Sequence, residues 1–268
     1  MKILLRVIVA ATIIFLMLPL VFVIISSFGA SALMVFPPKS YTLDWYRNIP
    51  TPFLNSLKVS LIVATVTAFI ATIVGTGAAM ALSRGRFAGL RTLGVFTLSP
   101  LMVPTIVSAV ALFQFTGLFW DITGIELAGT LMGIIMGHTA YAIPYVVRAV
   151  VAGHSHFDYS LEEAALSLGA SRLRTVLSIT LPVLLPGIVS GTLFAFLISL
   201  DDLPIALFMT GGESTTTLPV KIYTTIEYSL NPDVMAISSI LIFGSLALVI
   251  LLDRTLGLER VFGSSKTY

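Results

Sequence analysis

Hydrophobic residues gather into six long stretches that contain no Asp, Glu, Lys or Arg. Each is long enough for a helix across a hydrocarbon core of about 30 Å, which takes about 20 residues. Lipid offers no water to backbone polar groups, so a spanning segment must satisfy them internally, and these stretches are expected to be helices. They cover residues 7–28, 59–82, 92–120, 127–147, 175–200 and 234–252.

Two of these stretches do not fit one simple helix. Residues 92–120 are overlong and contain Pro100 and Pro104, which predicts a bent helix with a short piece at the membrane surface. Residues 175–200 begin too early, because Leu181-Pro182 is expected to end a cytoplasmic helix before the fifth span starts.

Composition agrees with a membrane protein. The chain is 57% hydrophobic and 10% charged with a mean hydropathy of +1.02, whereas a soluble domain carries about 25% charged residues. We therefore predict an all-α membrane protein with six transmembrane helices in a single domain over residues 1–268. The net charge of +2 and the lack of a basic run argue against nucleic acid.

Few residues offer metal or covalent chemistry. The chain has no Cys, which excludes disulfides, thiolate metal sites and Cys nucleophiles. Its three histidines, His138, His154 and His156, lack metal-site spacing and are interpreted as loop residues near a membrane surface. No bound cofactor or metal is expected.

The basic residues predict the orientation, because cytoplasmic loops carry an excess of Lys and Arg. With the N-terminus inside, both termini are cytoplasmic and the outer loops hold only four basic residues, Lys39, Arg47, Lys58 and Lys221. The inner side holds eleven: Lys2, Arg6, Arg84, Arg86, Arg91, Arg148, Arg172, Arg174, Arg254, Arg260 and Lys266.

Small residues recur at the spacing that lets membrane helices approach closely. Packing within the chain suffices to explain most of these pairs, and an interface between subunits would need other support. The pairs are Gly75 with Ala79, Gly133 with Gly137, and Gly187 with Gly191.

The inner loop between the fourth and fifth spans has a sequence pattern of its own. Ser160 and Glu163 form an S-x-x-E capping box that starts a short helix, and Gly169 suits a left-handed cap at its end. Ser171 can cap a second helix, which Pro182 is expected to stop. The first helix places four apolar residues on one face, namely Leu161, Ala164, Ala165 and Leu168. An amphipathic bend at the inner membrane surface is therefore predicted.

This loop resembles the EAA motif of permeases of binding-protein-dependent ABC importers. Glu163-Ala164-Ala165, then Gly169, then Ile179 after nine intervening residues, and finally Leu181-Pro182 match every element of the motif. In that family the loop is the coupling helix, which seats in a cleft of a cytoplasmic ATPase subunit. The resemblance thus implies two ATPase partners bound through residues 160–182, with ATP and Mg held by those partners.

The resemblance implies coupling roles for six loop residues, three of which have a simpler alternative. Glu163 could serve only as a helix cap, Gly169 only as a backbone requirement, and Arg172 could contact lipid headgroups instead of the ATPase. The six residues are Glu163, Ala164, Ala165, Gly169, Ala170 and Arg172.

Over roughly residues 55–252 the chain is most similar to the second permease of spermidine/putrescine importers, with the helix at 7–28 packing peripherally. The supporting segments are Ser199-Leu-Asp201-Asp202, Thr210-Gly-Gly and Leu218-Pro-Val-Lys-Ile-Tyr223. The similarity implies a bacterial inner-membrane importer of a polyamine. A second permease, from a different chain, and an external solute-binding protein would complete it. Another organic amine, an opine or an amino-acid derivative remains an alternative cargo.

Asp201 and Asp202 lie about 28 Å along the fifth helix, near its outer end. A carboxylate within a membrane costs on the order of 2.5–3.5 kcal/mol on insertion scales, so it usually faces a cavity or a partner. Either residue could attract an ammonium-bearing substrate, with Asp201 favoured. The alternatives are that it pairs with a basic residue of another permease or lies in water at the outer surface. Further polar candidates for the path are Ser199, Gln114, His138 and Tyr141; satisfaction by neighbouring helices is the alternative.

Other functional classes fit poorly. The chain lacks G-x-x-x-x-G-K-[ST], H-E-x-x-H and G-x-S-x-G, so neither a nucleotide-binding loop nor a familiar catalytic motif is present. Adjacent aspartates on a helix point about 100° apart, which disfavours an aspartyl dyad and an intramembrane enzyme. A stand-alone secondary transporter would normally show inverted repeats, and none is found. The chain is predicted to be a non-catalytic permease subunit.

Overall fold

The computed structural model describes residues 2–31, 35–85, 88–154, 157–228 and 232–256; Arg86, His156, Arg260 and Lys266 lie outside them. Six of the described helices are long and apolar enough to cross a membrane, which confirms the predicted class. They are α1 (Lys2–Ser27), α3 (Thr51–Arg84), α5 (Thr105–Thr123), α6 (Leu131–His154), the helical stretch Arg172–Asp201 that ends in α9 (Leu181–Asp201), and α12 (Pro232–Leu256).

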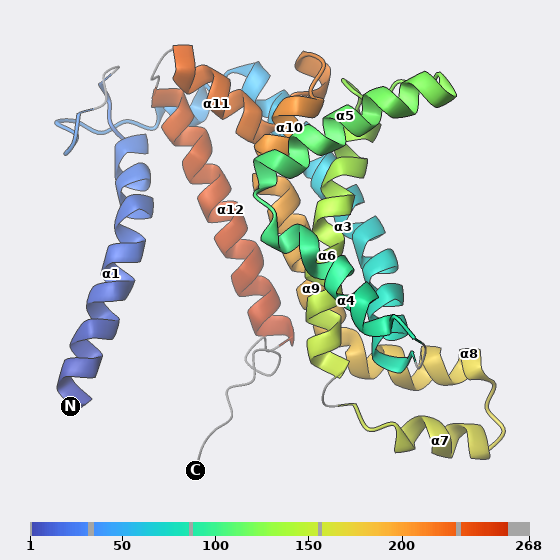
Figure 1. Ribbon diagram of the computed structural model, residues 1–268. Coiled ribbons are helices and arrows are strands. Elements are labelled where there is room, and N and C mark those ends of the chain that lie inside the picture. The colour runs from blue at the N-terminus through green and yellow to red at the C-terminus, as the bar shows by residue number, and fades with distance from the viewer. Residues whose placement is uncertain (1, 32–34, 86–87, 155–156, 229–231, 257–268) are drawn as a thin grey trace.

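Helices α3, α6 and α9 form the central bundle (Figure 1). Their contact is lined by small side chains and by valines, so the helix backbones come close together. A hydroxyl pair, Thr72 Oγ1 and Thr192 Oγ1 at 2.8 Å, adds a hydrogen bond between α3 and α9. The buried core residues are Ala68, Ala71, Ala79, Ala142, Val146, Val147, Val150, Leu184 and Ala195.

The glycines at helix-packing spacing lie at contacts within the chain. A Cβ added to Gly75 would lie 2.7 Å from Cβ of Val146, and one added to Gly191 would lie 3.0 Å from Cα of the same valine. On Gly187, an added Cβ would lie 3.0 Å from the carbonyl oxygen of Ala149 in α6. A side chain at Gly75 would therefore force its neighbours to shift, and Gly187 and Gly191 are tightly packed, as the packing interpretation predicted.

The third apolar stretch is bent at Pro104, with a different division from the predicted one. Helix α4 (Leu90–Leu98) continues into a 3₁₀ turn, Ser99–Met102, and α5 begins at Thr105. Val103 is extended, with φ −88° and ψ 131°, as expected for a residue before proline. Figure 1 shows α4 beside the bundle and α5 running obliquely across its upper end, so this apolar stretch forms two helices set at an angle to each other.

The prediction that Pro182 ends a helix was wrong. Helix α8 (Arg172–Thr175) continues through a π turn, Val176–Thr180, into α9, and the Leu181 N–H bonds to the Val176 carbonyl five residues back. Pro182 is the second residue of α9 and follows this π turn directly; because it has no N–H, the helix continues there with one backbone hydrogen bond fewer. The chain changes direction there, because α8 runs across the lower end of the bundle while α9 rises through it (Figure 1).

The interpretation of the histidines as loop residues was also wrong for the two that are described. His138 and His154 both belong to α6 and are only 2% and 5% exposed. His138 lies beside Ser199, and His154 lies beside the rings of Phe157 and Tyr159. The sequence alone does not indicate these contacts.

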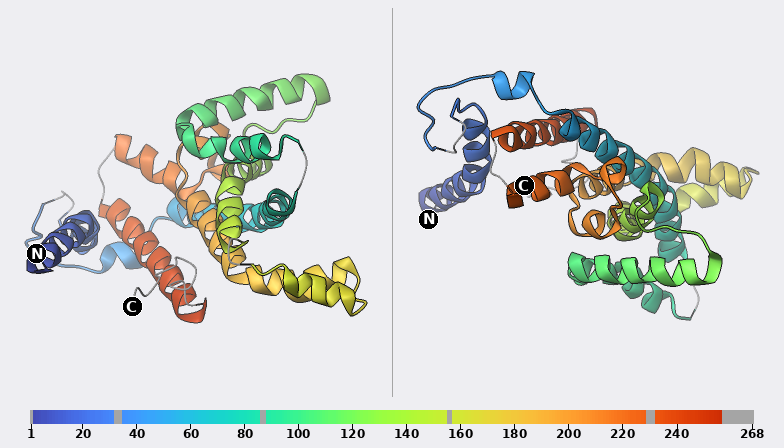
Figure 2. Two further views of the ribbon diagram at one scale, coloured as in Figure 1. Left: turned by 60° about the horizontal axis from the view of Figure 1, so that its bottom comes forward. Right: turned by 90° about the horizontal axis from the view of Figure 1, so that it is seen from above.

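Helix α1 stands apart from the central bundle and packs against α12 (Figures 1 and 2). Residues 2–22 are exposed throughout, although this helix is the most apolar of the six candidate spans. Among the described residues, side-chain hydrogen bonds hold its upper end: the Tyr46 hydroxyl, from the short α2 (Asp44–Arg47), lies 2.6 Å from both Ser27 Oγ and Ser239 Oγ.

The two ends of the bundle carry different short helices. Helices α10 (Pro204–Met209) and α11 (Leu218–Tyr228) and a 3₁₀ turn, Glu213–Thr215, lie at the upper end. Helices α7 (Ser160–Ser167) and α8 lie at the lower end, where α1 starts and α12 finishes (Figure 1). The loop that contains α7 and α8, the start of α1 and the end of α12 thus lie at the same end of the bundle.

Two glycines of α3 test the packing of the central bundle. Gly75→Leu forces a side chain into Val146. We therefore expect it to lower the free energy of unfolding by about 1–3 kcal/mol, the usual cost of overpacking. Gly77→Leu is the matched control on the same helix, because no atom lies within 4 Å of its added Cβ. Thermal unfolding of the purified chains in detergent measures the difference, and equal midpoints for the two variants would contradict the packing described here.

Candidate functional site

The lower loop forms two short helices joined at Gly169. Gly169 has φ +83°, a left-handed conformation that favours glycine. The Ala170 N–H donates to the Ala165 carbonyl and the Gly169 N–H to that of Leu166, which satisfies carbonyls at the end of α7. Ser171 Oγ accepts from the Arg174 N–H at 3.3 Å and caps α8. The predicted glycine and serine caps are both confirmed.

The predicted capping box was wrong. Tyr159 precedes α7, and the side chain that caps its first turn is Asp158, whose Oδ1 accepts from the Ser160 N–H at 2.9 Å. This hydrogen bond holds the pKa of the Asp158 carboxyl below its ordinary value. An Asp two residues before the helix competes with Ser160 for the same orphan N–H groups, and the sequence offers both.

The outward side of the loop carries both apolar and charged side chains. Glu163, Ala164, Gly169 and Arg172 are exposed, while Ala165 and Ala170 are half-buried. Leucines surround them: Leu168 is 89% exposed and Leu173 69%. A leucine that is exposed on a short, capped helix suits contact with another protein or with the membrane surface. All six predicted coupling residues therefore lie on one accessible hairpin.

One polar group of this loop escaped prediction. Glu162 forms an ion pair with Arg84, the last residue of α3, and accepts a hydrogen bond from Thr180. Arg84 is 78 positions away from Glu162 in the chain, and Thr180 is 18 positions away, beyond the turn at Gly169. The available signal was a charged residue directly at the end of an apolar stretch, which Arg84 is.

At the upper end, a break separates α9 from α10. Asp202 is extended, with φ −68° and ψ 121°, and the residue is 7% exposed. Oδ1 of Asp202 accepts from the N–H groups of Ile205 and Ala206 at 2.9 and 3.2 Å, in the first turn of α10. Its carboxylate is thus used inside the chain, where it caps α10.

His138 joins this break to α6. Its Nδ1 lies 2.8 Å from Ser199 Oγ, and its Nε2 lies 3.3 Å from Asp202 Oδ1. Serine, histidine and aspartate together suggest a hydrolase triad, but all three are buried, with Ser199 only 4% exposed. An enclosed serine cannot meet a substrate, so the group is best described as a polar junction between α6, α9 and α10.

The remaining path candidates do not gather at this junction. Asp201 is exposed, one position before the buried Asp202, as expected for adjacent residues at the end of a helix. Tyr141 donates to or accepts from Thr105 Oγ1 at 3.0 Å, which ties α6 to the start of α5. Gln114 is exposed on α5. Of the predicted path residues, the structure brings Ser199 and Asp202 together with His138 and leaves Asp201 facing outward.

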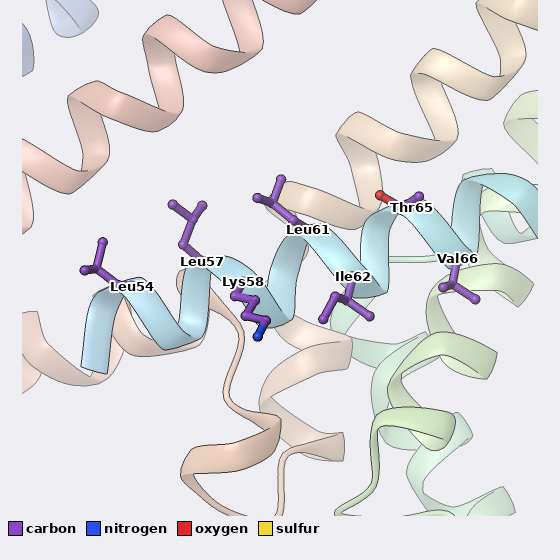
Figure 3. Close-up of a pocket in the computed structure, with 7 residues that line it drawn as sticks. All are labelled: Leu54, Leu57, Lys58, Leu61, Ile62, Thr65 and Val66. Atoms are coloured by element: carbon purple, nitrogen blue, oxygen red, sulfur yellow. The ribbon is translucent and has the colours of Figure 1, made fainter. Parts of the chain in front are cut away.

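A shallow hollow of about 480 Å³ lies along the upper half of α3. Figure 3 shows its side chains projecting from this one helix in two rows, which correspond to spacings of three and four residues. Such rows are typical of a helix face that packs against another helix or lipid, and the hollow contains none of the path candidates. Its lining residues are Leu54, Leu57, Lys58, Leu61, Ile62, Thr65 and Val66.

The sequence of this chain is similar to those of known transport proteins. Residues 71–258 match the family described as binding-protein-dependent transport system inner membrane component. The putrescine transport system permease protein PotI of Escherichia coli K12 is 32% identical over 238 residues, covering 88% of this chain and 84% of that protein. The spermidine/putrescine transport system permease protein PotC of Haemophilus influenzae is 34% identical over 218 residues, covering 80% and 81%.

A solved structure shares the fold at low sequence identity. It belongs to a bacterial ABC transporter involved in the import of the acidic polysaccharide alginate. The TM-score is 0.72, with 17% identity and 95% of each chain covered. At this identity the match concerns the fold alone.

The two adjacent aspartates are expected to differ in stability. Asp202→Ala removes the cap of α10 and strands His138, so we expect a loss of about 2 kcal/mol in the free energy of unfolding. Asp201→Ala, the matched control, removes an exposed carboxylate and should change it by no more than about 0.5 kcal/mol. Thermal unfolding in detergent measures both, and an equal loss in the two variants would contradict the buried role of Asp202.

Proposed function

The chain belongs to the family of binding-protein-dependent transport system inner membrane components, and on this premise we propose that it imports a small organic amine, specifically a polyamine. As the permease component of an ABC importer it spans the membrane and is not itself catalytic. ATP hydrolysis belongs to separate ATPase subunits, which use ATP and Mg.

The polyamine assignment rests first on the relatives. Two permeases named for putrescine or spermidine transport align with 80–88% of this chain at 32–34% identity. The fold cannot carry the assignment, because a protein of the same fold belongs to an importer of an acidic polysaccharide. Recognition of the cargo must therefore depend on particular side chains.

Asp201 is the side chain that best fits an amine. It lies at the upper end of α9, where the helix breaks before α10, and is exposed. Among the described residues, no ion pair of Asp201 is formed within the chain. A carboxylate placed at membrane depth without such a partner is expected to face a polar cavity or another charged group. An ammonium-bearing cargo supplies that group, and Asp202 supports the site by fixing the break.

The partners follow from the two ends of the bundle. The exposed hairpin of α7 and α8 is proposed to seat in the ATPase subunits, with Glu163 and Arg172 on the contacting side. The positive-inside bias supports a cytoplasmic location for this end and for both termini. A solute-binding protein would then dock at the upper end, around α10 and α11. A second, different permease would complete the path beside the exposed face of Asp201.

Transport is proposed to follow from rigid-body motion. When the ATPase subunits close on ATP, the hairpins of the paired permeases are drawn together, and the bundles rock so that the path opens alternately to the two sides. Little can deform within the α3–α6–α9 bundle, because glycines there already bring backbones into contact.

Stimulation of ATP hydrolysis by the loaded binding protein tests the cargo. The whole complex is reconstituted in liposomes and given a panel of putrescine, spermidine, 4-aminobutyrate, an opine and sulfate. We expect putrescine or spermidine alone to stimulate hydrolysis and to be taken up. Stimulation by the opine or 4-aminobutyrate instead would replace the cargo while keeping the importer class, and stimulation by sulfate would contradict an amine site.

The role of Asp201 is tested in the same complex. Asp201→Asn keeps the size of the side chain and removes the charge, so we expect polyamine uptake to fall at least about tenfold, the effect of losing one interaction of about 1.4 kcal/mol. Asn is also expected to leave assembly unchanged, which co-purification of all subunits monitors. Wild-type uptake by Asp201→Asn would refute the site.

A further inference from the structure

Two adjacent carboxylates of α7 face different surroundings. Glu163 is exposed on the outward side of the hairpin. The Glu162 side chain is only 16% exposed, and it faces the bundle, because successive residues on a helix are turned by about 100°. The motif that identifies the loop contains Glu163, so Glu162 needs a separate explanation.

Glu162 joins three elements at one point. Its Oε1 accepts hydrogen bonds from Nη2 of Arg84, at the end of α3, and from Oγ1 of Thr180, at the end of the π turn before α9. Arg84 Nη2 also donates to Thr180 Oγ1 at 3.0 Å. Each of the three side chains therefore contacts the other two, and α7 is fixed to both α3 and α9.

The surroundings strengthen this contact. Thr180 is fully buried, and the Arg84 side chain is 28% exposed. A partly buried pair is less screened than a surface pair, and removal of one partner leaves the other charge without compensation. Nearby, Tyr159 donates to the Ser83 carbonyl at 3.4 Å, and the rings of His154 and Phe157 lie 5.4 Å apart. The start of α7 is thus held to α3 and α6 as well.

The far end of the hairpin has no comparable attachment within the described residues. Leu168 is 89% exposed and Gly169 has no atom within 4 Å of an added Cβ. An object held at one end and free at the other acts as a lever. Motion imposed on its free end is passed to whatever holds the fixed end, in this case α3 and α9.

We propose that Arg84, Glu162 and Thr180 form a clamp that transmits movement of the α7–α8 hairpin to the transmembrane bundle. This inference rests on the proposed docking of the hairpin to the ATPase subunits. Glu163 and Glu162 then have separate tasks: Glu163 contacts the ATPase, and Glu162 is a positioning residue that keeps the hairpin rigid against its own bundle.

A role in transmission differs measurably from a role in stability. If the clamp only stabilised the fold, its loss would reduce the yield of assembled complex, and the complex that remained would transport a normal amount of solute per ATP. If the clamp transmits motion, assembled complexes hydrolyse ATP without moving solute. The number of solute molecules taken up per ATP hydrolysed is therefore the decisive quantity.

The experiment compares the reconstituted complex carrying Glu162→Gln, Thr180→Val or the exchanged pair Arg84→Glu with Glu162→Arg. We expect complexes with either single substitution to assemble and to retain basal ATP hydrolysis. Their uptake per ATP should fall about tenfold, a factor typical of the coupling between two sites. The exchanged pair should recover part of the uptake per ATP that Glu162→Gln loses, because the two positions again carry opposite charges. Glu163→Gln is the matched comparison and should weaken co-purification of the ATPase, which the clamp variants should not.

Normal uptake per ATP in Glu162→Gln and Thr180→Val would overturn the clamp. If Glu162→Gln does not assemble, Thr180→Val decides, since it removes one hydroxyl from a buried side chain of similar shape. Failure of the proposed function is recognised separately, because the wild-type complex would then show no ATP hydrolysis stimulated by any loaded binding protein. Loss of assembly in every clamp variant, with no change in uptake per ATP in the remainder, would assign the three residues to stability alone.

Discussion

The close approach of three helices around Val146 sets the rest of this structure. Val146 of α6 lies against Gly75 of α3 and Gly191 of α9, where even a single added carbon would lie within 3.0 Å of it. In lipid there is no hydrophobic gain from joining apolar helices, so association depends on packing of this kind. The bundle that results can move as a body more easily than it can deform.

The groups with chemical character lie at the two ends of that bundle. At the lower end, Glu162 attaches a capped hairpin to α3 and α9. At the upper end, Asp202 and His138 hold the break after α9, and Asp201 is left facing outward. Each end thus pairs a buried polar group, which fixes the backbone, with an exposed one that is available to a partner or a cargo. A rigid bundle between them connects the two ends mechanically.

The sequence predicted the helices and the hairpin, because both depend on local properties. Charge-free stretches are read directly from composition, and Gly169 and Ser171 act on their own neighbouring N–H and C=O groups. Errors arose where local rules compete: Asp158 caps α7 in place of Ser160, and a π turn lets the helix continue past Pro182.

The clamp and the junction at His138 could not be predicted, because each depends on contacts between residues far apart in the chain. Arg84 and Glu162 are separated by 78 positions, and His138 and Ser199 by 61. The different surroundings of Asp201 and Asp202 could not be predicted either, because nothing in the sequence distinguishes the two adjacent aspartates. Only the turn of the chain after Asp201 decides which one is buried.

The central claim, that hairpin and bundle move together, is tested most directly by distances between spin labels in the assembled importer. The chain has no Cys, so Ser167→Cys on α7 and Thr65→Cys on α3, both exposed, can be labelled selectively. We predict that the distance between these two labels is the same with and without bound ATP, while the distance from Ser167→Cys to a label on the partner permease shortens. A change in the first distance with the second constant would contradict the account.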